Sequence, residues 1–304
     1  DGTRALREIN VKLEAGKVTA FVGPNGSGKS TLLLVLAGLL EPSDGEVIFD
    51  GRSVREIGIE YRRKCGVLFQ NPSDQLLAPT VWEDVSIGPS QLGLRGSELE
   101  LVVERSLKKL GVFDLRTKSP HRLSQGQAAR VALAGIIAQS PVVMLLDEPS
   151  SSLDAGGLRI LEELIEEAKG LGRIVGVASQ DTEFVARVAD HIYVLADGEV
   201  VSHGSPKEVL CNVDLLESVG IRAPFAVRVY KVLFGTESGA PITEEELRVV
   251  LKAPPQLPQY DPESSLLQGL MQGNRDLDDL LVPLLEPHVA ALLPDNSKPS
   301  SREP

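Results

Sequence analysis

The sequence predicts an α/β fold with a mostly parallel sheet and one antiparallel element. Between residues 16 and about 211, short apolar runs alternate with helical patterns, and this alternation implies crossover connections between parallel strands. Asp197-Gly198 stands between two apolar runs, and such a pair is a strong signal for a hairpin turn. The hairpin adds the antiparallel element.

The expected strands are short apolar runs of the kind that are buried in a sheet. They lie at residues 18–22, 66–69, 142–146, 174–178, 192–196 and 199–202. One helix is expected to begin near Lys29 and to include Leu39, and another is expected to follow Ser124. A further helix is indicated by apolar residues that recur on one helical face: Leu158, Leu161, Leu164, Ile165 and Ala168.

Composition excludes several classes of protein. The 304 residues include 31 Lys and Arg against 43 Asp and Glu, a net charge of −12, and only 4% are aromatic. Extended nucleic-acid surfaces usually carry a basic excess and stacking aromatics, so nucleic acid is not expected as a partner. Cys65 and Cys211 lie far apart with no CxxC pattern, which fits a reducing cytosol. No apolar segment approaches the about 20 residues of a spanning helix and no signal-peptide pattern is visible, so we expect a soluble chain.

The composition changes after residue 212, and three regions are expected. Residues 1–212 form the main domain, and residues 213–272 form a small C-terminal domain with an acidic helix start at 243–247. Residues 273–304 are expected to be an acidic, proline-rich and partly disordered tail. From Pro254 onward the chain holds 9 of its 20 prolines, which disfavours long regular helices there.

A phosphate-binding motif follows the first expected strand. Gly23-Pro24-Asn25-Gly26-Ser27-Gly28-Lys29-Ser30 matches the pattern G-x-x-x-x-G-K-[ST], between a strand and a helix. Glycines let backbone N–H groups surround phosphate oxygens, and the helix N-terminus favours negative charge. We therefore expect Lys29 to reach the β- and γ-phosphates of a nucleotide and Ser30 to bind Mg²⁺. The alternative is an ordinary glycine-rich turn.

Two carboxylates end the strand at residues 142–146. Asp147 is placed to hold Mg²⁺, as a strand-end Asp does in P-loop nucleotidases, and Glu148 is placed to orient or deprotonate the attacking water. The alternative is a strand that ends at a charged, solvated turn. A third segment, Leu123-Ser124-Gln125-Gly126-Gln127, precedes a helix, and the spacing of Ser124 and Gln127 also fits a simple capping box.

Together with Gln70 and Ser151-Ser152-Leu153-Asp154, these motifs resemble the nucleotide-binding subunit of ATP-binding-cassette (ABC) transporters over residues 4–210. The resemblance implies a P-loop cassette fold with a helical signature subdomain. More narrowly, residues 69–76 and the pattern from Pro79 to Pro89 resemble the cobalt and energy-coupling-factor branch. Residues 213–252 are similar to the small C-terminal domain of that branch, which helps the ATPases to dimerise.

The resemblance implies ATP and Mg²⁺ as cofactors and assigns roles to single residues. The implied nucleotide-binding residues are Gly23, Pro24, Asn25, Gly26, Ser27, Gly28, Lys29, Ser30 and Thr31. The implied Mg²⁺ ligands are Ser30, Gln70 and Asp147, and the implied catalytic residues are Glu148, Gln180 and Gln70. Ser124, Gly126 and Gln127 are expected to serve the ATP site of a partner cassette, and Asp154 is expected to link the two sites.

The implied assembly is a membrane importer for vitamins or transition-metal ions. Its expected members are a second ABC ATPase subunit, identical or different, a transmembrane coupling subunit and a substrate-binding membrane subunit. The chain would then lie peripherally on the cytoplasmic face of the cell membrane. The alternatives are a regulatory subunit with weak turnover and a non-transport cassette ATPase that acts on DNA or ribosomes.

Three positions depart from the family pattern. Gln125 replaces a glycine and would cost about 1 kcal/mol if that position needs a positive φ. Gln180 replaces the usual switch histidine, so the residue can donate a hydrogen bond but cannot acquire a positive charge. The adenine-stacking aromatic of the family is not found before Phe21. From Gln180 we expect normal binding of Mg-ATP with slow hydrolysis; a fully active tolerated replacement is the alternative.

Overall fold

The structure, a computed structural model, describes residues 4–252 and centres on a six-stranded sheet in the order β4-β5-β6-β1-β7-β8. The sheet comprises β1 (Lys17–Val22), β4 (Cys65–Leu68), β5 (Val143–Asp147), β6 (Ile174–Ser179), β7 (His191–Ala196) and β8 (Glu199–Gly204). All neighbours pair in parallel except β7 and β8. A separate antiparallel pair consists of β2 (Ile48–Phe49) and β3 (Arg52–Ser53). The predicted mixed sheet is confirmed.

The hairpin between β7 and β8 forms at the predicted turn. Ala196 pairs with Glu199, which leaves Asp197 and Gly198 as the two loop residues. Their φ angles are 48° and 81°. Both lie in the left-handed region that a two-residue type I′ turn requires, and Asp and Gly tolerate it better than most residues.

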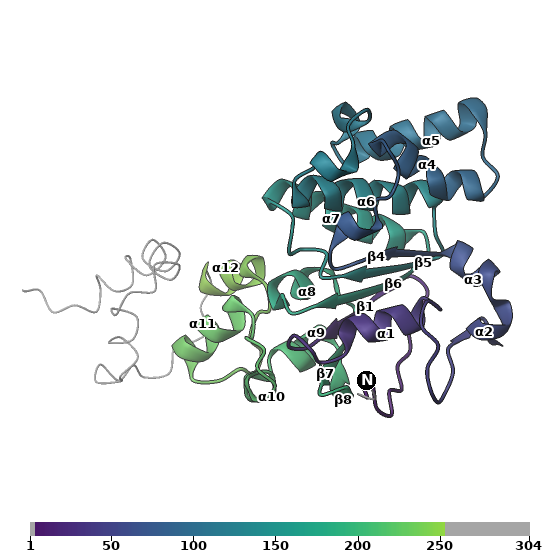
Figure 1. Cartoon of the computed structure of the whole chain (residues 1–304). Helices are drawn as coiled ribbons and strands as arrows, with labels where there is room; N and C mark the ends of the chain where they lie inside the picture. Colours follow the sequence, from purple (N-terminus) through teal and green to yellow (C-terminus); the bar gives the residue numbers. More distant parts are fainter. Residues whose placement is uncertain (1–3, 253–304) are drawn as a thin grey trace, which may run out of the picture.

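Helices cover both faces of the sheet (Figure 1). The first half contains α1 (Lys29–Leu36), α2 (Val54–Ile57), α3 (Ile59–Lys64), α4 (Val81–Gln91) and α5 (Gly96–Lys109). The second half contains α6 (Gln125–Gln139), α7 (Ala155–Gly170), α8 (Thr182–Val188), α9 (Pro206–Leu210), α10 (Val213–Ser218), α11 (Phe225–Phe234) and α12 (Glu244–Lys252). Short 3₁₀ turns lie at Pro72–Gln75, Phe113–Leu115 and Pro120–Arg122.

Alternate strand residues pack on opposite faces, as the two-residue period of a strand requires. Phe21 of β1 and Leu145 of β5 pack with Leu32 and Leu33 of α1. On the opposite face, their sequence neighbours pack against α6, α7 and α8. The helical face predicted from residues 158–168 is the buried face of α7. Leu39 was expected in α1, but the helix ends at Leu36 and Leu39 is exposed.

A helical region formed by α4, α5 and α6 stands above the sheet in Figure 1. Both α4 and α6 begin with complete capping boxes, Thr80 with Glu83 and Ser124 with Gln127. Each box satisfies two backbone donors that a helix N-terminus leaves free. The capping interpretation of Ser124 and Gln127 is therefore confirmed.

Helices α10, α11 and α12 follow the sheet and share part of its core. Val213, Leu216 and Val227 belong to the same buried cluster as Ala20 of β1 and Ile192 of β7. Ala226, Val229 and Leu247 form a smaller cluster between α11 and α12. The part of the predicted C-terminal domain after residue 252 and the predicted tail lie outside the described residues. Among the described helices, none is long and apolar enough to cross a membrane.

Candidate nucleotide site

The motif residues meet because the strands that precede them end at one edge of the parallel sheet. The register pairs Val22 with Ser179, Asp147 with Ala178, and Leu68 with Leu146. Four features therefore lie together: the loop after β1, the carboxylates at the end of β5, Gln70 after β4, and the segment Ser179–Asp181 at the end of β6, the switch segment. The carboxyl edge of a parallel sheet is the common place for ligand sites in α/β proteins.

The loop between β1 and α1 needs glycine at two positions for different reasons. Gly28 has a φ of 99°, which an L side chain rarely adopts. At Gly23, a Cβ atom would lie 2.2 Å from the backbone oxygen of Leu195, so no side chain fits between the loop and β7. The β7–β8 turn also contacts the loop, because Gly198 N donates a hydrogen bond to Ser27 O at 3.2 Å.

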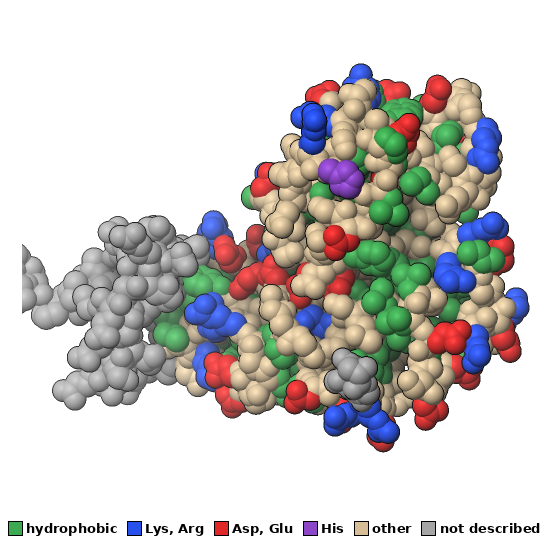
Figure 2. Space-filling view, viewed as in Figure 1, with side chains coloured by type: hydrophobic (Ala, Val, Ile, Leu, Met, Phe, Trp, Pro, Cys, Tyr) green, Lys and Arg blue, Asp and Glu red, His purple; other side chains and the backbone are tan. Residues whose placement is uncertain are grey.

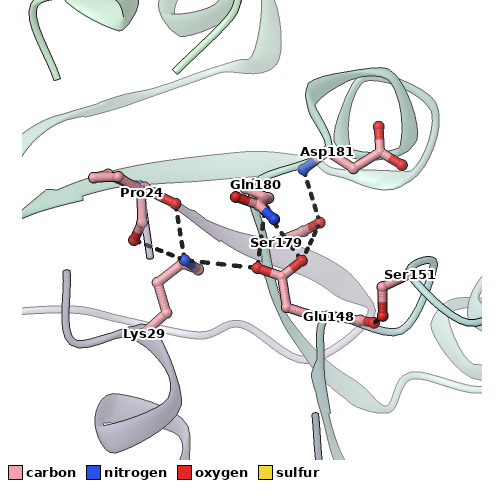
Figure 3. A network of polar contacts seen from close by, with 8 residues as sticks. Pro24, Lys29, Glu148, Ser151, Ser179, Gln180 and Asp181 are labelled. Atoms are coloured by element: carbon pink, nitrogen blue, oxygen red, sulfur yellow. Dashed lines mark hydrogen bonds and ion pairs between the residues drawn. The ribbon is translucent and has the colours of Figure 1, made fainter. Parts of the chain in front are cut away.

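Lys29 begins α1 and turns back over this loop. Its ammonium group donates to the carbonyl oxygens of Gly23 at 2.8 Å and Pro24 at 3.1 Å. Figure 3 shows the same group directed at the Glu148 carboxylate. A buried charge needs such partners to offset its desolvation, and Lys29 is 5% exposed.

Glu148 is held by groups from two strands. Its carboxylate accepts hydrogen bonds from the Ser179 hydroxyl at 3.2 Å and from Gln180 N at 3.2 and 3.3 Å. Its backbone has a φ of 46°, in the left-handed region that glutamate seldom occupies, and its N–H donates to Ala178 O at 2.8 Å. Backbone strain of this kind costs about 1–3 kcal/mol and persists where surrounding contacts hold it. The result is a carboxylate with a defined orientation.

Both strand-end carboxyl groups have altered acidity. Burial raises the pKa of Glu148, while the Lys29 ammonium opposes that rise. Burial also raises the pKa of Asp147, against the influence of the nearby Ser30 hydroxyl and of Lys29. Asp147 Oδ1 is buried without a hydrogen-bond partner among the described residues. A buried, unsatisfied carboxylate oxygen is costly and is the kind of atom that a cation would satisfy.

A cavity of about 250 Å³ opens at this edge. It is lined by Ala5, Asn25, Gly26, Gly28, Lys29, Ser30, Thr31, Gln70 and Glu148. Of the predicted nucleotide-binding residues, Gly23 and Pro24 instead supply carbonyl acceptors to Lys29, and Ser27 is buried in the turn. The Gln180 side chain is exposed, and this residue contacts Glu148 through its backbone N–H.

The segment Leu123–Gln127, the signature segment, lies against the loop that carries Asp154, and neither lines this cavity. A Cβ on Gly126 would lie 2.9 Å from the Ser152 carbonyl oxygen, so these backbones approach closely. Asp154 accepts from Gly157 N at 2.8 Å and forms an ion pair with Arg130 of α6. Gln125 is the first residue of α6 and is not among the described residues with positive φ. The cost expected for a left-handed Gln125 does not arise.

Sequence reasoning missed two features of the site. One is Ala5, which lines the cavity because Arg7 N bonds to Gly198 O at 2.7 Å and holds the N-terminal segment against the β7–β8 turn. The other is the left-handed backbone of Glu148. The pattern of residue types carries no direct signal for either, and no aromatic residue is among the described residues that line the cavity.

Comparisons with known proteins show the family in which this arrangement occurs. Residues 6–151 match the family model described as ABC transporter. The energy-coupling factor transporter ATP-binding protein EcfA of Methanothermobacter thermautotrophicus is 46% identical over 231 residues, which cover 74% of this chain and 73% of the relative. The chain belongs to the ABC transporter family.

Solved ABC structures agree with the fold of this cassette. The cbiO1 protein of Clostridium perfringens, described as part of the ABC transporter complex cbiONQ, has a TM-score of 0.61 at 37% identity; the match covers 71% of this chain and 87% of that one. A dimeric ATP-binding cassette bound to ADP and Pi has a TM-score of 0.61 at 29% identity, covering 67% and 91%. The predicted cassette fold and family are confirmed, and ABC ATPases bind and hydrolyse ATP.

Proposed function

We propose that the chain is the ATP-hydrolysing subunit of a membrane importer of the energy-coupling factor or cobalt type. The observation that carries the proposal is the meeting of Lys29, Asp147 and Glu148 at one sheet edge beside the cavity, in a chain 46% identical to an EcfA protein. ATP-driven closure of two cassettes would supply the work. Cargo of this branch, vitamins or transition-metal ions, would be chosen by a separate membrane subunit.

The triphosphate would lie at the N-terminus of α1. Backbone N–H groups from Asn25 to Thr31 and the positive end of the helix favour an anion there. Lys29 would exchange its carbonyl partners for phosphate oxygens. Mg²⁺ fits beside Asp147, because one oxygen of that buried carboxylate lacks a partner among the described residues. Ser30 and Gln70 would complete the protein ligands, and the ion would offset phosphate charge.

Hydrolysis requires a base for the attacking water, and Glu148 is the residue placed for this role. Ser179 and Gln180 N hold its carboxylate, so the orientation exists before substrate binds. Ser124, Gly126 and Gln127 would act on the nucleotide of a second cassette, and Asp154 would join the sites. Ser124 is exposed at the start of α6, where a partner can reach it.

A membrane partner also accounts for apolar side chains on the surface. Figure 2 shows hydrophobic side chains over the face between the helical region and the elements near α2 and α3. Leu77, shortly before α4, is 79% exposed, and Ile59, the first residue of α3, is 56% exposed. Exposed apolar patches of soluble domains commonly mark interaction sites. This supports attachment to a transmembrane coupling subunit at the cytoplasmic face.

The test is purification of the tagged full chain from native membranes in detergent. Small hydrophobic membrane proteins and a cassette partner should co-purify, and the complex should release phosphate from Mg-ATP. A Lys29→Ala variant should co-purify equally and release none, which ties the activity to this chain when both cassettes are the same. Recovery with ribosomes or DNA instead would overturn the importer proposal in favour of a non-transport ATPase.

We further propose that this chain hydrolyses ATP slowly at its own site because Gln180 replaces a histidine. The backbone contact to Glu148 does not depend on the side chain, so Gln180→His should preserve carboxylate orientation while restoring a group that can carry positive charge. In the assembled complex, the variant should raise kcat. Equal turnover of the two proteins would show that glutamine is a fully active replacement.

A further inference from the structure

The two residues that follow the switch segment Ser179–Asp181 bind the C-terminal helices. The Thr182 hydroxyl donates a hydrogen bond to the Arg222 carbonyl oxygen at 2.8 Å, and the Glu183 carboxylate accepts one from Phe225 N. Thr182 is 5% exposed, so water is a poor substitute for its partner. These contacts join segments about 40 residues apart in the chain.

Glu183 acts as the cap that α11 lacks in its own sequence. The residue before α11 is Pro224, whose side chain has no hydrogen-bond acceptor. The carboxylate of Glu183 reaches the first backbone N–H of the helix from α8 instead. A negative group at a helix N-terminus also interacts favourably with the helix dipole. Glu183 is therefore a residue of α8 whose side chain caps α11.

The same short stretch of chain holds the catalytic carboxylate on its other side. Asp181 N donates to the Ser179 hydroxyl oxygen at 3.0 Å, and that hydroxyl donates to Glu148 at 3.2 Å. Figure 3 shows Ser179, Gln180 and Asp181 beside Glu148. Asp181 also caps α8 by accepting from Phe184 N at 3.1 Å. Hydrogen bonds on either side of the short backbone segment 181–183 thus connect Glu148 with α11.

Apolar packing makes this connection stiff. Val185 of α8 lies in one buried cluster with Leu216 of α10 and Val227 of α11. Figure 1 shows α8 between the sheet and the C-terminal helices. Close-packed interiors transmit displacement rather than absorb it. A shift of the start of α11 would therefore move the start of α8 and, with it, the groups that orient Glu148.

We infer that the start of α11 is a positioning element of the ATPase site, and that Thr182 and Glu183 are the positioning residues that transmit its placement to Glu148. The inference rests on the proposed role of Glu148 as the base in ATP hydrolysis. Neither residue lines the nucleotide cavity, so both act through the switch segment. The start of α11 then influences the rate of the chemical step without touching ATP.

The experiment compares three variants of the full chain in the purified transporter complex. Glu183→Ala removes the acceptor for Phe225 N, whereas Glu183→Gln keeps an oxygen that can accept the same bond. Asn212→Ala is the matched control, because Asn212 caps α10 by accepting from Leu215 N at 3.1 Å and has no hydrogen bond to the switch segment among the described residues. Both Glu183→Ala and Asn212→Ala remove a helix cap, so both should lower the thermal stability to a similar extent.

The inference predicts a kcat effect with an unchanged KM for Mg-ATP. Glu183→Ala should lower kcat by about tenfold, a loss of about 1.4 kcal/mol of transition-state stabilisation. Glu183→Gln should restore most of it, and Asn212→Ala should leave kcat near that of the wild type. Hydrogen exchange should rise over residues 174–181 in Glu183→Ala alone. Should Glu183→Ala not fold, Thr182→Val gives the same comparison by removing the bond to Arg222.

Two results overturn the inference. One is an equal kcat in Glu183→Ala and Asn212→Ala with no difference in exchange at residues 174–181. The other is a lower kcat that returns to the wild-type value once rates are divided by the folded fraction of each protein, because loss of folded protein lowers the apparent kcat without changing KM. Failure of the proposed function would give a different result. The wild-type complex would then have no ATPase activity, or Glu148→Gln would leave its activity unchanged.

Discussion

Lys29 Nζ lies 3.6 Å from Glu148 Oε1, and each of the two side chains is only 6% exposed. The pair is formed by the motif lysine at the start of α1 and the carboxylate that directly follows β5. In this state the proposed phosphate ligand and the proposed base neutralise each other. A nucleoside triphosphate would compete with Glu148 for Lys29. Nucleotide binding would therefore release the Glu148 carboxylate from the ion pair.

Replacement of Glu148 by Gln should separate hydrolysis from binding. Gln keeps the shape and can still accept from Ser179 and Gln180 N, but it is not a base. We expect phosphate release by the complex to fall by about 100-fold or more, the usual contribution of a general base. Binding of Mg-ATP should persist, measured by equilibrium titration with a fluorescent analogue. Residual turnover near the wild-type rate would exclude Glu148 from the chemical step.

Replacement of Lys29 by Ala should instead weaken the binding of Mg-ATP itself. The ammonium group is the one side-chain cation that lines the cavity in the described part of the chain. Hydrogen bonds to charged groups contribute about 1.5–3 kcal/mol, which corresponds to about 10–150-fold in Kd. The same titration measures this loss. Lys12→Ala is a suitable control, because Lys12 is a surface residue paired with Glu14.

Strong alkali should destabilise the fold through Cys65. Burial raises the pKa of its thiol to about 12, and burial also raises the pKa of the neighbouring Tyr61 hydroxyl. Above about pH 9 the unfolded chain loses the thiol proton while the folded chain retains it, so the free energy of unfolding falls as pH rises. The contribution of the thiol to the free energy of unfolding is fully present below the ordinary thiol pKa. It is lost as the pH rises toward the raised pKa of the folded state.

Urea unfolding of the wild type and Cys65→Ala measures this effect. The stability difference between the two proteins should be constant at neutral pH, where neither form ionises. At higher pH the wild type should lose stability faster, with a slope of up to about 1.4 kcal/mol per pH unit from one group. Parallel curves for the two proteins across the alkaline range would show that the thiol ionises equally in both states.

Most of the framework of the site was predictable because its elements carry strong local signals. The strand before Gly23 and the strand before Asp147 are short apolar runs, and the hairpin at Asp197-Gly198 has the residue types that its φ angles require. The left-handed backbone of Glu148 was not predictable, because residue type gives no such signal for glutamate. The contact from Glu183 to Phe225 depends on tertiary packing, which local patterns do not encode.

Substitutions at the adjacent positions Gly126 and Gln125 of the signature segment should differ in the size of their effects. A Cβ at Gly126 would lie 2.9 Å from Ser152 O, so Gly126→Ala must displace either α6 or the loop that carries Asp154. Overpacking of this kind costs about 1–3 kcal/mol. Because Asp154 also binds Arg130 of α6, the displacement should disturb both surfaces offered to a partner cassette. We therefore expect lower stability and lower ATPase activity, with ATP binding by the isolated subunit retained.

Gln125→Gly, which restores the family glycine, should not improve the enzyme. Gln125 begins α6 without a positive φ, so glycine relieves no strain there and instead increases the entropy that folding must overcome, at a cost of up to about 1 kcal/mol. Thermal unfolding should show a small decrease in Tm, and turnover of the complex should not rise. A simultaneous gain in Tm and turnover would show that Gln125 distorts the segment, and Gln125→Ala, which keeps a Cβ, would then fail to reproduce that gain.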